Sequence, residues 1–261
     1  MSSSPPIVLT FAGSDPTGGA GLQADVLTIA SCGCHPVSVL TAITVQDTRG
    51  VESLHAVDAA LVRAQAHALL ADLRIAAFKL GVLGSRENAR AVAELLALHP
   101  RVPVVLDPVL ASGRGDPLAG EDTVHALREF LLPLATVATP NSVEARRLGG
   151  CAALADCAKA LLARGAGYVL VTGTHEEAPE VTNTLYGAHG AVREDRWPRL
   201  PASYHGSGCT LASALAAGLA RGLDVPQAAR EAQAFTWQAL ARGFRPGAGQ
   251  HLPHRGLAPG A

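Results

Sequence analysis

The segment "HGSGCTLASALAAG" (205–218) places a cysteine among small residues at the expected start of a helix. Gly206, Ser207 and Gly208 leave backbone N–H groups open, and the helix dipole adds positive potential, so this pattern indicates an anion site. Cys209 is expected to have a lowered pKa there, and a thiolate can accept a substrate proton while the N–H groups hold a phosphoryl group. The alternative is a small cysteine that packs a helix start.

Three further side chains carry oxygens that suit a cation. Asn141 and Glu144 lie three residues apart around a helix start in "TPNSVEA" (139–145), and such oxygens bind Mg²⁺, usually through water. Capping of the helix by Asn141 explains the same spacing. Asp107 in "VVLDPVL" (104–110) ends an apolar run, and an acid at the end of a buried strand must be paired or functional.

The glycine-rich stretch "FAGSDPTGGAGLQAD" (11–25) lies between a strand and a helix. Gly19, Gly21 and Ala24 match the spacing G-x-G-x-x-G/A, but the strand ends several residues too early for a dinucleotide fingerprint. A phosphate-binding loop of the Walker A type is excluded because no Gly-Lys-Ser/Thr follows. Two interpretations remain: a loop that brings N–H groups and Asp25 to a small ligand, or a turn with a close helix-to-sheet contact.

These residues need a scaffold, and the chain alternates short apolar runs with longer helical segments. Expected strands span 7–11, 37–43, 77–83, 103–109, 135–139 and 168–173, followed by a β-hairpin within 181–195. Expected helices span 19–31, 58–74, 86–98, 120–131, 142–149, 153–165, 208–221 and 225–242. The alternation predicts right-handed βαβ units and a mainly parallel sheet covered on both faces. Ligands of such sheets bind beyond the carboxyl ends of the strands, where the polar residues above fall.

Composition excludes several classes of protein. The 261 residues carry a net charge of −1 and only 4% aromatic side chains, which disfavours a nucleic-acid surface. Five cysteines lack zinc spacing and are expected to be free thiols of a cytoplasmic protein. Neither a signal peptide nor a membrane span is expected. We expect one domain over 1–261, with tails at 1–5 and 245–261.

Together these stretches resemble the ribokinase-like kinases, and among them the hydroxymethylpyrimidine and phosphomethylpyrimidine kinases of thiamine synthesis. The resemblance runs nearly end to end and is carried by "AGSDPTGGAGLQAD", "SVLTAITVQDTRGV", "KLGVLGS", "LDPVLASGRGDPL", "LLPLATVATPNSVEA" and "HGSGCTLASALAAGLARG", with a faint match in "GAGQHLPHR". It implies a three-layer ribokinase-like fold with helices on both faces of the sheet and a small β flap.

The resemblance also implies roles at matching positions. Gln46 would read the aminopyrimidine edge, and Gly13, Asp25, Val82 and Val109 would line the substrate pocket. Gly206, Ser207 and Gly208 would form an anion hole with Cys209 as the base, while Asp107, Asn141 and Glu144 would organise Mg²⁺ and phosphates. Thr172, Gly173 and His175 would contact the nucleotide. The implied reaction is phosphorylation with ATP and Mg²⁺, often twice to give the diphosphate, and the family suggests a homodimer.

Two positions depart from the family pattern. The segment "VLVTGTH" (169–175) has Thr172 where the family commonly has lysine, so a cation expected near the ATP phosphates is missing there. Lys79 or Arg114 would be a substitute. Val82 replaces the usual methionine, which loosens the expected stacking on the pyrimidine.

Two other functions compete with the pyrimidine kinase. A pyridoxal or pyridoxine kinase of the same superfamily acts on a similar aromatic alcohol, but Gln46 favours an aminopyrimidine because a primary amide can pair with an amino group and a ring nitrogen. A non-catalytic pyrimidine-binding protein is the third hypothesis, motivated by Thr172.

Overall fold

The computed structural model describes residues 4–112, 115–116 and 118–256. Its centre is a nine-stranded sheet in the order β3-β2-β1-β4-β5-β6-β7-β8-β9. Pairing is parallel from β2 to β7, and β3, β8 and β9 add antiparallel pairs at the two edges. The strands are β1 (Ile7–Ser14), β2 (His35–Gln46), β3 (Val51–Ala56), β4 (Ile75–Leu80), β5 (Val104–Leu106), β6 (Val137–Ala138), β7 (Tyr168–Thr172), β8 (Glu180–Gly187) and β9 (Gly190–Pro198).

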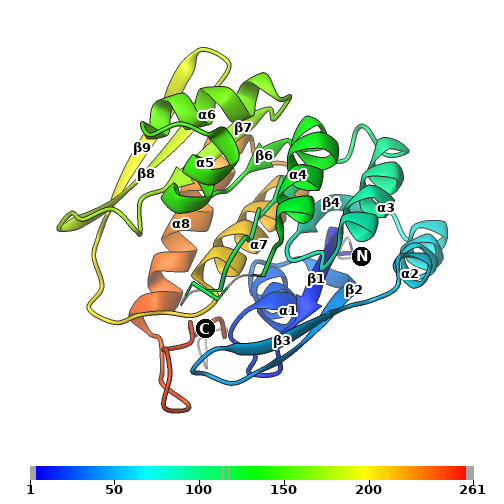
Figure 1. The fold of residues 1–261 in the computed structure, drawn as a ribbon, viewed down its shortest axis with the longest axis horizontal. Helices are drawn as coiled ribbons and strands as arrows, with labels where there is room; N and C mark the ends of the chain where they lie inside the picture. The colour runs from blue at the N-terminus through cyan, green and yellow to red at the C-terminus, as the bar shows by residue number, and fades with distance from the viewer. Residues whose placement is uncertain (1–3, 113–114, 117, 257–261) are drawn as a thin grey trace.

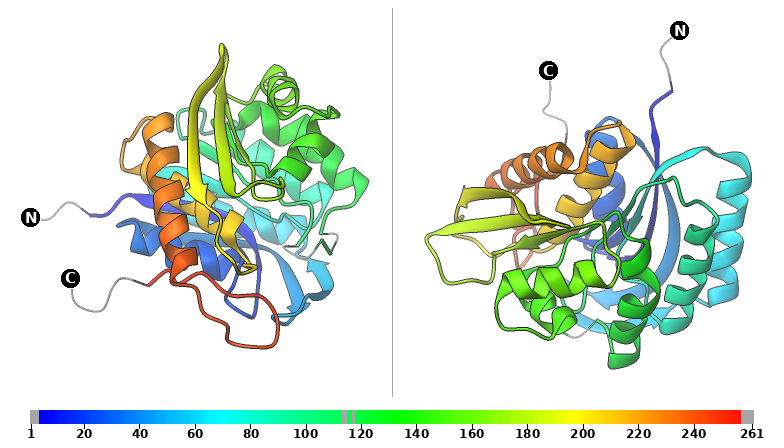
Figure 2. Two further views of the ribbon diagram at one scale, coloured as in Figure 1. Left: turned by 90° about the vertical axis from the view of Figure 1, so that its left-hand side faces the viewer. Right: turned by 90° about the horizontal axis from the view of Figure 1, so that it is seen from above.

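Helices cover both faces of this sheet (Figures 1 and 2). One face carries α1 (Gly21–Ser31), α7 (Ser207–Ala220) and α8 (Val225–Ala241). The other carries α2 (Ala59–Asp72), α3 (Arg86–Ala97), α4 (Glu121–Ala126), α5 (Ser142–Gly149) and α6 (Leu154–Ala163). After α4 the chain continues through a π-helical turn, η1 (Leu127–Leu131), and a 3₁₀ turn, η2 (Leu132–Leu134). The predicted three-layer α/β fold is confirmed.

Two hydrophobic cores explain why the central strands read as unbroken apolar runs. Successive residues of β1 point to opposite faces, so Val8 packs with the helices of one layer and Leu9 with those of the other. Both side chains are fully buried. Because each central strand is covered on both sides, it has no polar face, as expected for parallel sheets.

Local sequence signals set several of the helix boundaries. Asn141 and Glu144 form a capping box at the start of α5, and Gly150 ends this helix with a left-handed φ of +70°. Asp58 and Ser85 accept N–H bonds at the starts of α2 and α3. These signals place the helix boundaries within about two residues of the sequence expectation.

Strand ends differ from expectation by up to three residues, and one helix is interrupted: β1 extends to Ser14, whereas β4 and β5 end at Leu80 and Leu106. β2 runs to Gln46, three residues past the expected strand, and pairs with β3, so the flap is a two-stranded ribbon. The expected helix over 120–131 is α4 followed by the wider turn η1. Figure 1 shows the flap ribbon crossing the lower side of the molecule.

Candidate active site

A cavity of about 520 Å³ opens at the carboxyl ends of the parallel strands. This volume suits a small-molecule site. Thirteen of the fifteen predicted site residues line it: Gly13, Gln46, Val82, Asp107, Val109, Asn141, Glu144, Thr172, His175, Gly206, Ser207, Gly208 and Cys209. Asp25 and Gly173 do not line it. The sheet topology therefore gathers residues that are far apart in sequence, because parallel strands end at one edge.

The small residues before Cys209 form the start of α7, which we call the anion cradle (residues 206–209). Gly206 has a left-handed φ of +83°, and a Cβ there would lie 1.8 Å from the carbonyl oxygen of Gly19. No side chain caps the first turn of α7, so its N–H groups stay available to a ligand. A Cβ at Gly208 would lie 3.8 Å from both carboxylate oxygens of Asp107, so the cradle lies beside this acid.

The expected lowering of the Cys209 pKa is wrong. Burial raises the pKa of the thiol to about 12; the charge of Lys79 lowers it, and the carboxylates of Asp107 and Asp25 raise it. Desolvation and two acids therefore outweigh the helix dipole, whose contribution is modest. The thiol is protonated at neutral pH and lies beside the Asp107 carboxylate, each affecting the pKa of the other.

Asp107 and Glu144 are two buried carboxylates at one side of the cavity. Burial raises the pKa of Asp107 to about 6, against the lowering effect of Lys79. Burial and the charge of Asp107 raise the pKa of Glu144 to about 8. Oδ2 of Asp107 is buried without a hydrogen-bond partner in the described part of the chain. Both carboxyl groups have raised pKa values, and one of them has an oxygen without a partner. A divalent cation bound here would stabilise their ionised forms, so the pair fits a cation site.

The capping interpretation of Asn141 and Glu144 also holds. Oδ1 of Asn141 accepts the Glu144 N–H at 2.9 Å, and Oε2 of Glu144 accepts the Asn141 N–H at 2.9 Å. Oε1 of Glu144 accepts the Leu110 N–H at 3.2 Å. The described residues hold no cluster of three or more acidic, histidine or cysteine ligands. This donor set fits Mg²⁺, which keeps several waters and takes few protein ligands beside substrate phosphates.

Asp25 lies beneath the cavity rather than in its wall. Its side chain is fully buried, and its carboxylate binds Lys79 Nζ at 2.9 Å, Thr10 Oγ1 at 2.6 Å and Ser213 Oγ at 2.8 Å. Burial lowers the pKa of Lys79, but the charges of Asp25, Cys209 and Asp107 outweigh it and raise that pKa. Lys79 is therefore a paired cation, and Arg114, the other substitute considered for the missing lysine, lies outside the described residues.

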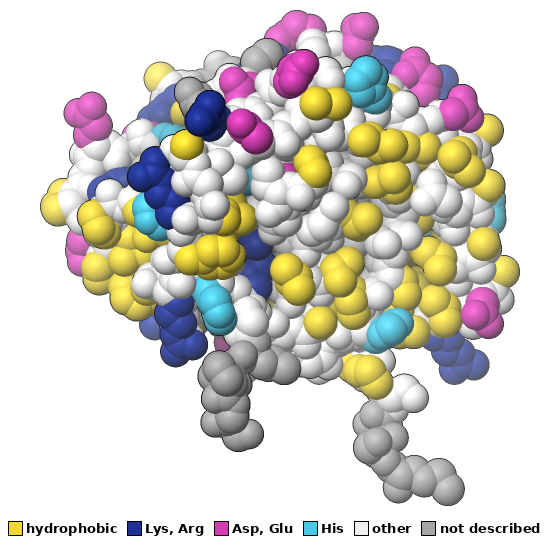
Figure 3. Space-filling view, turned by 90° about the horizontal axis from the view of Figure 1, so that it is seen from below, with side chains coloured by type: hydrophobic (Ala, Val, Ile, Leu, Met, Phe, Trp, Pro, Cys, Tyr) yellow, Lys and Arg dark blue, Asp and Glu magenta, His cyan; other side chains and the backbone are white. Residues whose placement is uncertain are grey.

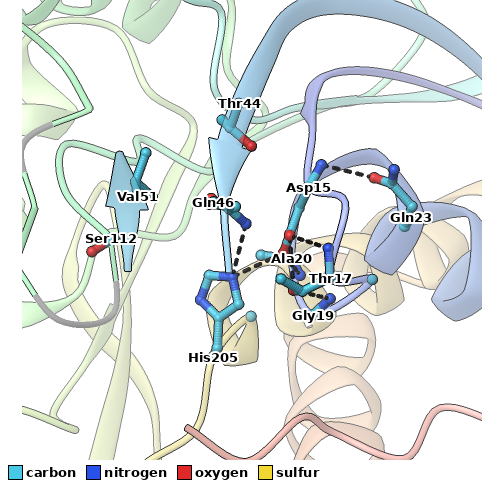
Figure 4. Close-up of polar contacts among 12 residues, drawn as sticks. Asp15, Thr17, Gly19, Ala20, Gln23, Thr44, Gln46, Val51, Ser112 and His205 are labelled. Carbon is cyan, nitrogen blue, oxygen red and sulfur yellow. Dashed lines mark hydrogen bonds and ion pairs between the residues drawn. The ribbon is translucent and has the colours of Figure 1, made fainter. Parts of the chain in front are cut away.

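Sequence reasoning missed a polar cluster around Asp15 on the substrate side (Figure 4). Asp15 Oδ1 accepts the N–H and hydroxyl of Thr17, both at 2.8 Å, and Oδ2 accepts the Ala20 N–H at 2.6 Å. His205 Nε2 lies 2.9 Å from Asp15 Oδ2 and 3.5 Å from Gln46 Nε2. The one local signal was Asp-Pro-Thr, which is typical of a turn closed by an aspartate side chain.

These bonds change the acidity of Asp15. Burial raises its pKa, but the hydrogen bonds from His205 and Thr17, together with the charge of His205, lower it overall to about 2. Asp15 therefore holds its negative charge next to Gln46 across the physiological range and accepts hydrogen bonds from three directions.

The other end of the cavity was only partly predicted. Thr172 and His175 line it, and the N–H of Gly173 binds Asn183 Oδ1 at 3.1 Å behind the wall. Trp237, which sequence reasoning missed, also lines this end. Arg199 lines it too and donates to the carbonyl oxygens of residues 174, 176 and 178 at 2.7–2.8 Å. A guanidinium group thus borders the region where Thr172 replaces the family lysine.

Comparison with known proteins places this site in a family. Residues 15–254 match the family model described as phosphomethylpyrimidine kinase. The chain is 42% identical to the hydroxymethylpyrimidine/phosphomethylpyrimidine kinase of Streptomyces coelicolor, over 94% of this chain and 92% of the relative. It is 37% identical to the protein of that name from Escherichia coli, over 90% of each chain.

Solved structures show the same fold. The ADP complex of Bacillus subtilis pyridoxal kinase superposes with a TM-score of 0.88 at 30% identity, covering 97% of this chain and 98% of the other. The phosphomethylpyrimidine kinase of Clostridium difficile gives a TM-score of 0.79 at 31% identity, covering 90% and 99%. The family model spans most of the chain and the curated relatives share its name, so this chain belongs to the phosphomethylpyrimidine kinase family.

Proposed function

We propose that this protein phosphorylates the hydroxymethyl group of 4-amino-5-hydroxymethyl-2-methylpyrimidine with MgATP, and then its monophosphate to the diphosphate, in thiamine diphosphate synthesis. The observation that carries the proposal is the shared cavity, which is lined both by Gln46 and by the anion cradle of residues 206–209 beside Asp107. Family membership supports the same kinase activity.

On the substrate side, Gln46 pairs with the amino group and ring nitrogen of the pyrimidine. Gly13, Val82 and Val109 supply its apolar surroundings, and their places in the cavity wall support this role. Asp25 acts from behind the wall, where it holds Lys79. An amide that faces an aromatic ring from one edge fixes which way the hydroxymethyl group points.

On the reaction side, the cradle N–H groups hold the transferring phosphoryl group, and Asp107, Asn141 and Glu144 hold Mg²⁺ through water. Mg²⁺ supplies charge neutralisation for the phosphates when it is bound. Cys209 accepts the hydroxyl proton as the base. Because this thiol is protonated in the free protein, it can take the hydroxyl proton only as its own proton passes to the neighbouring Asp107 carboxylate, a transfer that costs free energy since the Asp107 pKa of about 6 lies far below that of the thiol.

The nucleotide occupies the end of the cavity near Thr172, Gly173 and His175. The ADP complex of the Bacillus subtilis pyridoxal kinase supports nucleotide use by this fold. Trp237 offers an aromatic surface at the same end.

Pyridoxal kinase is the second candidate, because pyridoxal kinases are among the solved structures with this fold. The deciding experiment incubates purified protein with MgATP and either hydroxymethylpyrimidine or pyridoxal, and detects products by mass spectrometry. We expect the mono- and diphosphate of the pyrimidine. Phosphorylation of pyridoxal alone would reject the proposal, and tight pyrimidine binding without ATP consumption would favour the non-catalytic alternative.

We also propose a cytoplasmic homodimer that does not act on nucleic acid or membranes. Within the described residues, no helix is both long and apolar enough to cross a bilayer. The outer side of the flap carries Ile43 and Val45 with side chains about half exposed, which supports a self-association surface.

A further inference from the structure

The C-terminal segment, defined as residues 244–255, folds back from α8 to the cavity. Gln250 lines the cavity, and its N–H donates to the Thr48 carbonyl in the flap turn at 3.0 Å. The N–H of His251 donates to the Ser203 carbonyl, just before the anion cradle, at 2.9 Å. Figure 1 shows this segment in red below α8. The C-terminal segment is therefore bonded both to the flap turn and to the residues that precede α7.

Arg255 ends this segment beneath the cradle, and its side chain is buried. The guanidinium donates to the carbonyl oxygens of Gly18 at 3.2 Å, Gly206 at 3.3 Å, and Gly19, and to Thr210 Oγ1 at 2.9 Å. One side chain thus bonds the glycine-rich loop after β1 and the first turn of α7.

The two loops that Arg255 joins are in backbone contact. A Cβ at Gly206 would lie 1.8 Å from the Gly19 carbonyl oxygen, and the same guanidinium nitrogen of Arg255 bonds both glycine carbonyls. The two carbonyl oxygens therefore share one donor, which links the two backbones directly. Arg255 supplies that donor, and its planar fork suits two acceptors at once.

The charge of Arg255 is placed differently from that of Lys79. Lys79 is neutralised by direct contact with Asp25. The hydrogen-bond partners of Arg255 within the described residues are carbonyl and hydroxyl oxygens. A positive charge without a carboxylate in contact therefore lies behind the start of α7, with the sign that favours an anion in the cradle.

We propose that Arg255 is a positioning residue for phosphoryl transfer. It ties Gly19 to Gly206, so that the N–H groups of residues 206–209 keep their direction toward the transferring group. The inference rests on the proposed kinase function. Because the effect depends on bonding two loops at once, lysine is a poor replacement.

The test measures kcat and KM for hydroxymethylpyrimidine in the full chain, together with thermal melting, for Arg255→Gln, Arg255→Lys and Arg255→Ala. The control is Arg245→Ala, in the same segment, because the partners of the Arg245 side chain among the described residues are the carbonyls of Gly249 and Ala248 in its own loop. We expect Arg255→Gln to lower kcat roughly 10- to 100-fold with little change in the pyrimidine KM. Arg255→Lys should fall between Arg255→Gln and the wild type.

Added guanidinium ion, at concentrations far below those that unfold the protein, should restore part of the activity of Arg255→Ala. It should leave the activity of the control Arg245→Ala unchanged. A folded Arg255→Gln with wild-type kcat would overturn the proposal, and so would a loss that only follows the unfolded fraction. If the Gln and Ala variants do not fold, Arg255→Lys decides, because unchanged kcat in that variant rejects the role of the fork.

Failure of the proposed function would look different. Wild-type protein that does not phosphorylate the pyrimidine rejects that function by itself. ADP binding, measured by calorimetry, then tests Arg255: we expect roughly tenfold weaker binding in Arg255→Gln. Equal affinities would overturn the positioning role.

Discussion

Cys209 shows how the surroundings of one residue override its local sequence. A helix start lowers a thiol pKa in water-exposed settings, yet burial together with Asp107 and Asp25 raises this one to about 12. The thiol can still accept a substrate proton if it passes its own proton to the neighbouring Asp107, but this transfer is uphill because Asp107 has the far lower pKa. In the free protein it is therefore a weak nucleophile that alkylating reagents attack slowly at neutral pH.

Replacing Cys209 with serine tests its role in proton transfer. We expect Cys209→Ser to fold normally and to lose about 10²-fold in kcat, because the less acidic hydroxyl transfers the proton poorly. Steady-state turnover with the pyrimidine and MgATP measures this. Cys32→Ser is the control, because Cys32 caps the end of α1 and does not line the cavity. Near-normal turnover of Cys209→Ser would reduce this residue to a packing role.

Asp15 predicts a pH dependence of stability. Its pKa is lowered from 3.8 to about 2 in the folded protein, so its ionised form stabilises the fold by about 2 kcal/mol above the unfolded pKa. This stabilisation is lost as the pH falls toward the folded pKa, and about half is gone by pH 3. Urea unfolding of wild type and Asp15→Asn between about pH 6 and pH 3 should show their stabilities converging. Parallel curves would contradict this.

At the scale of elements, one buried side-chain network joins the strands and helices under the site. Asp25 on α1 joins Lys79 on β4, Thr10 on β1 and Ser213 on α7 through one buried carboxylate. Removing one partner of such a buried ion pair leaves an uncompensated charge, which is strongly destabilising. This network lies directly beneath the cavity and includes Ser213 of α7, so it holds the helix that begins with the cradle in place against the sheet.

The two ends of α7 allow a matched test of backbone contact. Gly206 and Gly222 both have left-handed φ values, +83° and +89°, but a Cβ at Gly206 meets Gly19 while one at Gly222 meets nothing within 4 Å. Gly222→Ala should cost about 1 kcal/mol of unfolding free energy, from backbone strain alone. Gly206→Ala should cost about 3 kcal/mol more, at the upper end of overpacking effects, because two backbones must separate. Equal losses in urea unfolding would show that the contact is not tight.

At the scale of the whole molecule, the flap serves both the cavity and the surface. Gln46 at the end of β2 faces the cavity, while Ile43 and Val45 lie outside with exposed fractions of 50% and 47%. Figure 3 views the molecule from below Figure 1, where the flap lies, and shows many apolar side chains with few charged ones in its right half. Such a surface suits a second copy of the chain.

The proposed dimer can be tested at this surface. Light scattering of the wild type should give twice the 26.7 kDa chain mass, and the double variant Ile43→Glu/Val45→Glu should give the monomer mass, because buried unpaired charges oppose association. Leu98→Glu is the control, since Leu98 is 70% exposed at the end of α3. A wild-type monomer at micromolar concentration, or a double variant that stays dimeric, would contradict the proposal.

The sequence by itself determined the alternating α/β plan, most of the helix boundaries and the order of the segments that carry the site, while the strand ends were predicted to within about three residues. Apolar runs, capping residues and glycines act over a few residues, so their consequences can be read locally. Family motifs at Gln46, Asp107 and 206–209 could be placed for the same reason, and the sheet gathers them around one cavity.

Only the tertiary structure decided which of these groups face the cavity and which lie beneath it. Asp25 pairs with a lysine 54 residues away, and Arg255 bonds Gly19 across 236 residues. The Cys209 pKa likewise depends on the charges of Lys79, Asp107 and Asp25, which are far from it in sequence. Burial and pairing depend on which segments meet in space, and a local pattern cannot report the desolvation and ion contacts that follow.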